Sequence, residues 1–197
     1  MPTAFPDLSG QPRWRACLLP VILALVAGVL GTWGFAETLA WTNTEQFCIG
    51  CHEMRDNVYA EYQDTIHDTN RTGVRATCAD CHVPHATVPK LIRKAKASFE
   101  LYGHFTGKLD TPEKFEAHRY QMALKVWTDM RASDSAVCRH CHVEAKMNPS
   151  AQTEKALDRH EQGRKEGLTC IDCHFGIAHS EPDGELTPKE LGVPIQK

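Results

Sequence analysis

The sequence has very little material for an ordinary hydrophobic core. Its 197 residues would suit one compact domain or two small ones. Beyond residue 36, however, the chain is polar, interrupted by glycine and proline, and free of long apolar runs and convincing strand patterns. Such a chain cannot fill an interior with its own side chains. We therefore expect a mainly α-helical domain whose core contains another component.

A strong charge imbalance is also missing. The net charge at pH 7 is only −3. A protein that binds nucleic acid through its backbone phosphates usually has a basic excess or a basic patch. We therefore expect no nucleic-acid partner.

Charge is absent altogether from residues 16–36, which read ACLLPVILALVAGVLGTWGFA. These 21 residues are enough to cross a bilayer as a helix. Arg13 and Arg15 precede the segment and Glu37 follows it, so the positive-inside rule places the N-terminus in the cytoplasm. The expected divisions are a cytoplasmic segment 1–15, an anchor 16–36, an exported domain 37–182 and a tail 183–197.

A cleaved signal peptide is the competing interpretation of the same segment. Gly34, Phe35 and Ala36 match a small-x-small cleavage site. The apolar run is longer than the usual apolar region of a signal peptide, which favours an uncleaved single-pass anchor. Both interpretations export everything beyond residue 40.

Cysteine, in contrast, is abundant, with nine in the chain. Eight of them form four C-x-x-C pairs, each followed directly by a histidine, which is the attachment pattern of c-type haem. The two thiols bond to the porphyrin vinyl groups, and the adjacent imidazole reaches the iron. We predict four covalently bound haems c, whose apolar porphyrins form the missing core. The motifs are CIGCH (Cys48, Cys51, His52), CADCH (Cys78, Cys81, His82), CRHCH (Cys138, Cys141, His142) and CIDCH (Cys170, Cys173, His174).

Structural zinc or disulfides would be the alternative use of these cysteines. Four C-x-x-C pairs could form two four-cysteine zinc sites, and an exported chain could oxidise its thiols. Neither alternative explains why a histidine follows every pair.

The chain also repeats, because the motifs are 30 residues apart in the first half and 32 in the second. This predicts two duplicated dihaem modules, at about residues 45–90 and 135–180. Histidines outside the motifs recur at matching places, and we expect them to be the second axial ligands. His85 and His179 follow their own motifs too closely to reach the far side of those haems, so each is expected to bind a neighbouring haem. Surface or indirect roles are the alternative. The four predicted ligands are His67, His85, His160 and His179.

Three helices are expected in the exported domain. One covers about 89–102, with apolar residues on one side and a basic side that includes Lys94, interpreted as a solvated face. Another begins at Thr111 and Pro112 and carries His118, expected to pack against a haem edge rather than to ligate. A short one near 150–162 presents His160.

The anchor, the four motifs and the stretches GVRATCADCHVPH and TCIDCHFGIAH resemble the NapC/NirT family of membrane tetrahaem cytochromes c, from residue 15 to about 182. The resemblance implies a protein of the bacterial inner membrane with its haem domain in the periplasm. It implies oxidation of membrane quinol (menaquinol or ubiquinol) and electron transfer to a periplasmic reductase. The branch that serves nitrate reductase is the most similar, and nitrite or trimethylamine-N-oxide reductases are the alternatives. A multihaem enzyme that reduces a small oxyanion itself, or a passive electron wire, is less compatible with the anchor and the extra histidines.

The resemblance also implies roles for single residues. In CIGCHEM, Met54 would replace His52 as ligand of the first iron, and a thioether raises the reduction potential. The alternative is that His52 ligates while Met54 packs against the ring. Lys94 and Glu100 match the positions of quinol-site residues, with a lipid-headgroup contact as the alternative role of that helix.

Overall fold

The computed structural model describes residues 13–195 and divides into two units, which are treated separately. The first unit ends at Thr42 and the second begins at Asn43. The expected segments 1–15 and 183–197 lie partly outside the described residues.

The first unit is a single helix, α1 (Arg13–Trp41). Within it, Cys17–Trp41 is long and apolar enough to cross a membrane, and its side chains are not buried by protein. The hydroxyls of Thr32 and Thr38 donate to the carbonyls of Gly28 and Gly34, both at 2.8 Å, so the helix satisfies its own polar groups. This is what a bilayer requires of a spanning segment. The span extends past the expected end at residue 36.

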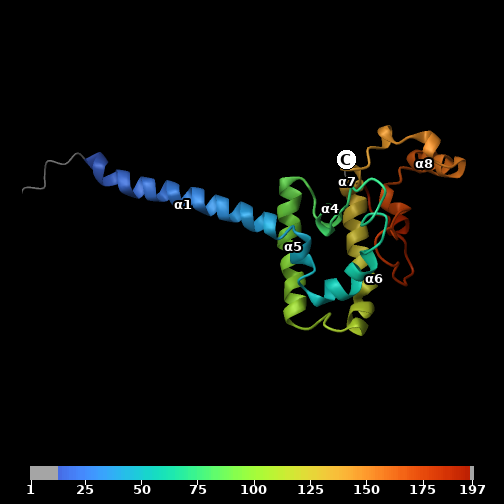
Figure 1. Ribbon diagram of the computed structural model, residues 1–197, viewed down its shortest axis with the longest axis horizontal. Coiled ribbons are helices and arrows are strands. Elements are labelled where there is room, and N and C mark those ends of the chain that lie inside the picture. Colours follow the sequence, from blue (N-terminus) through green and yellow to red (C-terminus); the bar gives the residue numbers. More distant parts are fainter. Residues whose placement is uncertain (1–12, 196–197) are drawn as a thin grey trace, which may run out of the picture. The chain divides into compact units, whose positions relative to one another are not determined.

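The second unit consists of short helical segments, loops and three longer helices, with no strand among residues 43–195. Figure 1 shows α5 (Thr87–Phe105) and α6 (Pro112–Ala132) as two long helices that run in opposite directions and are joined by a short loop. The expected mainly α-helical fold is confirmed. The remaining elements are α2 (Glu45–Cys48), η1 (Met54–Tyr59), α3 (Ala60–Tyr62), α4 (Cys78–His82), α7 (Ala136–Arg139), η2 (Glu144–Lys146), η3 (Pro149–Ala151), α8 (Glu154–Glu166), η4 (Cys170–Asp172) and η5 (Pro188–Leu191).

The longer helices begin and end where the sequence signals predict. Thr111 caps α6 by accepting a hydrogen bond from the Lys114 amide at 3.3 Å, and Pro112 occupies the first turn. Thr153 caps α8 in the same way, and Gly167 ends that helix with φ 67°. The three helices expected from the sequence are confirmed. Helix α5 is a few residues longer than expected, and α8 lies four residues further along the chain.

The polypeptide supplies almost no core of its own. Among the described residues, only four large apolar side chains are buried: Tyr62, Phe115, Trp127 and Ile171. A domain of this length normally buries most of its apolar side chains against one another. The described part of the chain therefore does not build a core from its own side chains, as the sequence predicts.

Helix α5 orients its two faces in the opposite way to the expected one. Its basic residues Lys90, Arg93 and Lys94 are half-buried, whereas Val88 is 66% and Phe99 79% exposed. The interpretation of the basic side as a solvated face is wrong for these three residues and holds for Lys96, whose side chain is 60% exposed.

Candidate haem sites

The last three cysteine motifs each fold into a helical turn. The second motif is helix α4 itself, and the His142 and His174 amides donate to the carbonyls of Cys138 and Cys170, both at 2.9 Å. Residues i, i+3 and i+4 share one face of such a turn. Both thiols and the following imidazole therefore point to the same side, as a covalently attached porphyrin requires.

The first motif is built differently. The Gly50 amide donates to Phe47 O at 3.3 Å, which makes a tight turn between the two cysteines. Met54 then opens η1, a π-helical segment (Met54–Tyr59). π-Helical turns are rare and frequently occur at functional sites.

Three of the four attachment histidines face one of the predicted distal histidines. The ring centroids are 6.1 Å apart for His67 and His142, 6.2 Å for His82 and His179, and 6.1 Å for His160 and His174. An iron about 2 Å from the ligating nitrogen of each of two imidazoles needs ring centroids roughly 6 Å apart. The spacing of all three pairs thus fits a haem iron between them.

The chemistry of these imidazoles fits the same group. Burial lowers the pKa of His82 to about 4, and it also lowers the pKa of His67, His174 and His179. A lowered pKa keeps the ring neutral, and the neutral ring is the form that binds metal. The Nδ1 atoms of His67 and His179 are buried without a hydrogen-bond partner among the described residues. Unpaired buried polar atoms indicate that a further group completes a site.

His85 is not opposite any attachment histidine. It stacks on His140 with ring centroids 3.7 Å apart, and both rings are exposed. The structure therefore brings together three of the four expected distal histidines with an attachment histidine and places the fourth elsewhere. His118 Nδ1 donates to Lys114 O at 2.8 Å, on its own helix.

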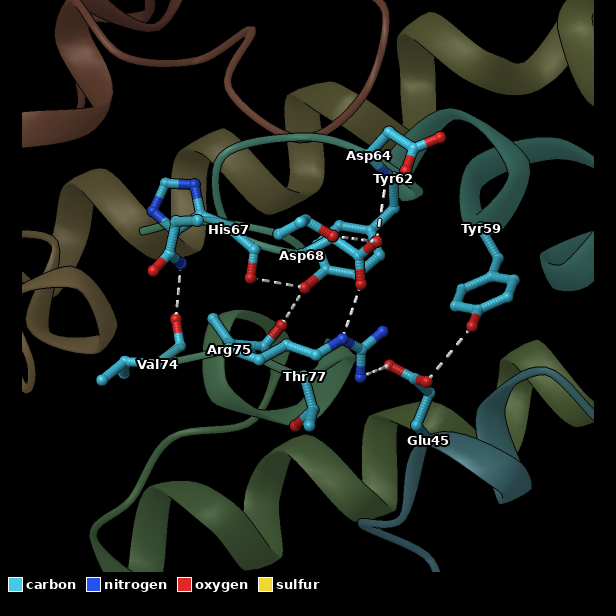
Figure 2. Close-up of polar contacts among 12 residues, drawn as sticks. Glu45, Tyr59, Tyr62, Asp64, His67, Asp68, Val74, Arg75 and Thr77 are labelled. Atoms are coloured by element: carbon cyan, nitrogen blue, oxygen red, sulfur yellow. Dashed lines mark hydrogen bonds and ion pairs between the residues drawn. The ribbon is translucent and has the colours of Figure 1, made fainter. Parts of the chain in front are cut away.

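The loop that presents His67 is held by a network of polar contacts (Figure 2). Arg75 binds Asp68 at 2.6 Å and Glu45 at 2.8 Å, which ties the loop to α2. The Tyr62 hydroxyl donates to His67 O at 2.9 Å. These contacts fix the backbone at His67, so contacts with other parts of the fold set the direction of its ring.

His179 is positioned by an ion pair between distant segments. Arg119 from α6 binds Glu61 from the segment after the first motif. Arg119 also donates to Ser180 O, and Ser180 N donates to Glu61, both at 3.0 Å. Ser180, the residue next to His179, is thus held by hydrogen bonds through both its amide and its carbonyl group.

The fourth motif is fixed by a buried polar cluster. The carboxylate of Asp172, with a fully buried side chain, pairs with Arg131 near the end of α6. Asp172 also accepts from the Thr169 amide at 2.8 Å, and Ser135 bonds Thr169 at 2.6 Å. Removing one partner of a buried ion pair of this kind strongly destabilises a protein, because the other charge is left unpaired. The cluster ties the fourth motif to α6 and α7.

The first motif has a different neighbour, the carboxylate of Glu53. This side chain is only 4% exposed, and its Oε1 lies 2.7 Å from His104 Nδ1 and 3.6 Å from His52 Nε2. His52 and His104 have ring centroids 6.1 Å apart, like the other pairs, but here an acid contacts both rings. Burial opposes ionisation of Glu53, yet the hydrogen bond from His104 holds its pKa below the usual value.

Lys94 lies beside the first motif, whereas Glu100 is an exposed residue paired with Arg93. Burial lowers the pKa of Lys94, and the neighbouring Arg93 and Lys90 lower it further, while the Cys48 thiol acts in the opposite direction. The Glu100 side chain is 64% exposed and pairs with Arg93 at 3.0 Å. Of the two residues expected at a quinol site, Lys94 is thus next to Cys48 of the first motif, and Glu100 stays a prediction.

The four motifs follow one another through space. The thiols of Cys48 and Cys78 are hydrogen-bonded, which joins the first motif to the second. Burial and the neighbouring Cys170 raise the pKa of Cys138 to about 11. The pKa of Cys81 is raised by burial, by the charge of Asp80 and, to a smaller extent, by the neighbouring Cys141. The second, third and fourth motifs are thus also neighbours.

The family model described as "NapC/NirT cytochrome c family, N-terminal region" matches residues 11–184. The chain belongs to the NapC/NirT cytochrome c family. It is 53% identical over 163 residues to the cytochrome c-type protein NapC of Escherichia coli strain K12, which covers 83% of this chain and 82% of that protein.

Other members of the family are similarly close. The denitrification system component NirT of Stutzerimonas stutzeri is 54% identical over 83% of this chain and 82% of its own length. A putative tetraheme cytochrome of Allochromatium vinosum is 45% identical over 85% of this chain and 91% of its own. No solved structure matches. As a NapC/NirT cytochrome, the chain is a haem c protein for membrane-anchored electron transfer, in agreement with its single apolar helix.

Two residues of the first site were not predicted. Glu53 stands inside the CIGCHEM stretch, between His52 and Met54, but a glutamate next to a haem motif gives no signal of burial. His104 lies 51 residues further along and does not recur in the second half. Only the contact between the two side chains identifies them.

Proposed function

We propose that this NapC/NirT cytochrome binds four covalent haems, oxidises membrane quinol and passes the electrons to a periplasmic reductase. The observation that carries the proposal is the contrast among the four motifs. Three have an imidazole opposite the attachment histidine, which suits haems that only carry electrons. The first also has an imidazole, His104, near its attachment histidine, but there a buried acid contacts both rings and a partly buried lysine lies beside the motif.

Each of the eight motif cysteines forms a thioether in this proposal. The second haem is held by His82 and His179, the third by His142 and His67, and the fourth by His174 and His160. His85, which does not face an attachment histidine, is left out of the ligand set. The cysteines are Cys48, Cys51, Cys78, Cys81, Cys138, Cys141, Cys170 and Cys173.

Met54 is the axial ligand that we assign to the first haem. The Glu53 carboxylate engages both His52 and His104, so the attachment histidine has a hydrogen-bonding acid close to its Nε2. Met54 is half-buried two residues after His52 and supplies a neutral thioether. With Met54 in this role, His104, whose ring centroid is 6.1 Å from that of His52, would be held by Glu53 rather than by the iron.

The reaction at the first site removes two electrons and two protons from one quinol molecule and leaves a quinone. The haem, when bound, accepts the electrons one at a time. Lys94, with a lowered pKa, orients the quinol oxygen and takes part in removal of its proton. Glu53, held as a carboxylate by His104, provides a second proton acceptor. The quinol site therefore contains Lys94 and Glu53, and Glu100 belongs to its surroundings at most.

The acceptor is a periplasmic reductase, and nitrate reductase is the one that we favour. Several relatives are named NapC, and the sequence resembles the branch that serves nitrate reductase. NirT and TorY are also relatives, so reductases of nitrite and trimethylamine-N-oxide are the alternatives. The orientation follows the positive-inside rule, with the haem domain in the periplasm.

The test uses the full chain with its haems in lipid vesicles. A menaquinol analogue and a ubiquinol analogue are added separately, and haem reduction is followed by absorbance. We expect rapid reduction by at least one quinol, and complete reduction of all four haems by dithionite. Reduction by dithionite alone would identify a passive wire and contradict the proposal. Turnover of nitrite or nitrate by the purified protein without a partner would identify a reductase instead.

A further inference from the structure

The outer face of α5 is unusually apolar for a surface that no protein covers. Val88, Ile92, Phe99 and Tyr102 recur at helical spacing along one side of the helix. Their exposed fractions are 66%, 53%, 79% and 69%. Contiguous exposed apolar surface of this kind marks a site of interaction with another protein or with a membrane.

The exposure is concentrated in this one helix. Thirteen large apolar side chains are exposed in the described part of the second unit, and seven of them belong to the 19 residues of α5. Scattered exposed apolar residues need no explanation, but a concentration on one helix does.

The residues of α5 that lie next to the first motif are on the other side of the helix. His104 and the half-buried Lys94 and Arg93 lie on the opposite side of α5 from Phe99, and His104 is the residue that contacts Glu53 of the first motif. A porphyrin attached at the first motif would therefore be held from the inner, basic side of the helix.

The chain itself brings a bilayer within reach of the domain. The apolar stretch Cys17–Trp41 has 25 residues. As a helix it is about 37 Å long, longer than the roughly 30 Å hydrocarbon layer. Helix α2 begins at Glu45, four residues after Trp41, and four residues span at most about 14 Å. The domain is therefore tethered directly at the membrane surface.

We infer that the outer face of α5 lies in the interfacial layer of the bilayer, as a second membrane contact besides α1. The aromatic side chains of Phe99 and Tyr102 suit the boundary between headgroups and acyl chains. Lys96, 60% exposed at the edge of the apolar face, can bind an anionic headgroup. The face thus differs from a soluble amphipathic helix, which turns its apolar side inward. The inference requires the membrane anchor but does not depend on quinol oxidation.

The experiment places the full haem-containing chain in vesicles of phosphatidylcholine and phosphatidylglycerol that contain a photoactivatable acyl chain. Labelled peptides are identified by mass spectrometry. We expect label in α1 and on residues 88–102 of α5, with none in α8. Label in α1 alone would overturn the inference.

Ile92→Ser/Phe99→Ser is the variant that removes the apolar face without touching the inner side. We expect labelling of α5 to fall to the level of α8, while α1 labelling and the haem spectrum stay unchanged. Leu186→Ser, at a residue 44% exposed outside α5, is the matched control and should leave α5 labelled. Unchanged α5 labelling in the double variant would overturn the inference. So would cross-links between α5 helices of two copies in place of lipid label, because they would make this face a protein interface.

Discussion

The first and fourth cysteine motifs share a sequence pattern but have opposite surroundings. Around the fourth motif, Ser135, Thr169, Asp172 and Arg131 form a buried polar cluster in which charges are paired. Around the first motif, the buried acid Glu53 contacts two imidazoles, and the partly buried Lys94 lies beside Cys48. One arrangement holds a motif in place, and the other leaves ionisable groups available for proton transfer.

The difference shows how one attachment pattern serves two purposes. A paired and fully buried carboxylate such as Asp172 mainly contributes to stability, because its charge is neutralised inside the protein. A lysine with a lowered pKa is a candidate for reactivity, because it gives up its proton more readily than an exposed lysine does. Variants at the fourth motif should therefore mainly lower stability, and variants at the first motif should mainly slow haem reduction by quinol.

The largest effect is expected when a motif loses both thiols. Cys48→Ser/Cys51→Ser and Cys170→Ser/Cys173→Ser should each reduce the haem load from four to three, because the thioethers of one haem are removed. Intact-mass spectrometry of the exported protein measures the load. We expect the fourth-motif variant also to lower stability and the first-motif variant mainly to abolish reduction by quinol. A wild-type mass with fewer than four haems would contradict the prediction that each of the four motifs attaches a haem.

Asp172→Asn tests the stabilising role of the fourth site. Removing one partner of a buried ion pair typically costs about 3–5 kcal/mol of unfolding free energy, because the remaining Arg131 charge is left unpaired. Guanidinium unfolding followed by circular dichroism measures the loss. Asp129→Asn, at a side chain 59% exposed, is the control and should change the free energy by about 0.5 kcal/mol or less. Equal free energies of unfolding for the two variants would contradict the stabilising role of the fourth site.

Lys94→Gln tests the reactive role of the first site. Loss of a group that acts in proton transfer typically slows a reaction on the order of 10²-fold. We expect this reduction in the rate of haem reduction by quinol in vesicles, with full reduction by dithionite retained. Lys96→Gln on the same helix, with a side chain 60% exposed, should keep the wild-type rate. Wild-type kinetics in Lys94→Gln would exclude this lysine and leave Glu53 as the residue to test.

Glu61→Gln extends the comparison to the second motif and should have the smallest effect. Burial opposes ionisation of Glu61, but hydrogen bonds from Arg119 and the Ser180 amide hold its pKa below 4.5. The unfolded chain therefore binds this proton more readily, so the carboxylate stabilises the fold above pH 4.5, and this contribution is lost as the pH falls through the folded-state pKa. We expect a loss of about 1 kcal/mol at pH 6 in Glu61→Gln, a size typical of a partly exposed ion pair.

The matched measurement for Glu61 is the pH dependence of unfolding. The difference in stability between wild type and Glu61→Gln should shrink as the pH falls from 6 to below 4.5. Glu116→Gln, which changes the 58% exposed partner of Arg119, should show little of this dependence. A constant difference at all pH values would mean that Glu61 acts through packing rather than charge.

The sequence by itself determined everything that depends on residues close together in the chain. Four C-x-x-C-H motifs predict haem attachment, because in a helical turn positions i, i+3 and i+4 share one face. The apolar segment predicts the spanning helix, and Thr111 and Pro112 predict the start of α6, because capping is also local. The shortage of apolar side chains predicts an interior that the chain does not fill alone.

Only the tertiary structure decided which distant residues meet at each motif. His67 faces His142 and His179 faces His82, so these pairs cross between the two halves of the sequence, whereas His160 faces His174 within one half. Repetition in the sequence made His85 equivalent to these histidines, but the fold stacks it on His140. Spacing along the chain cannot settle such pairings, because a contact between residues dozens of positions apart depends on loop paths and on ion pairs such as Arg119–Glu61. The burial of Glu53 against His104 was decided in the same way, by helix α5 returning to the first motif with its basic side inward.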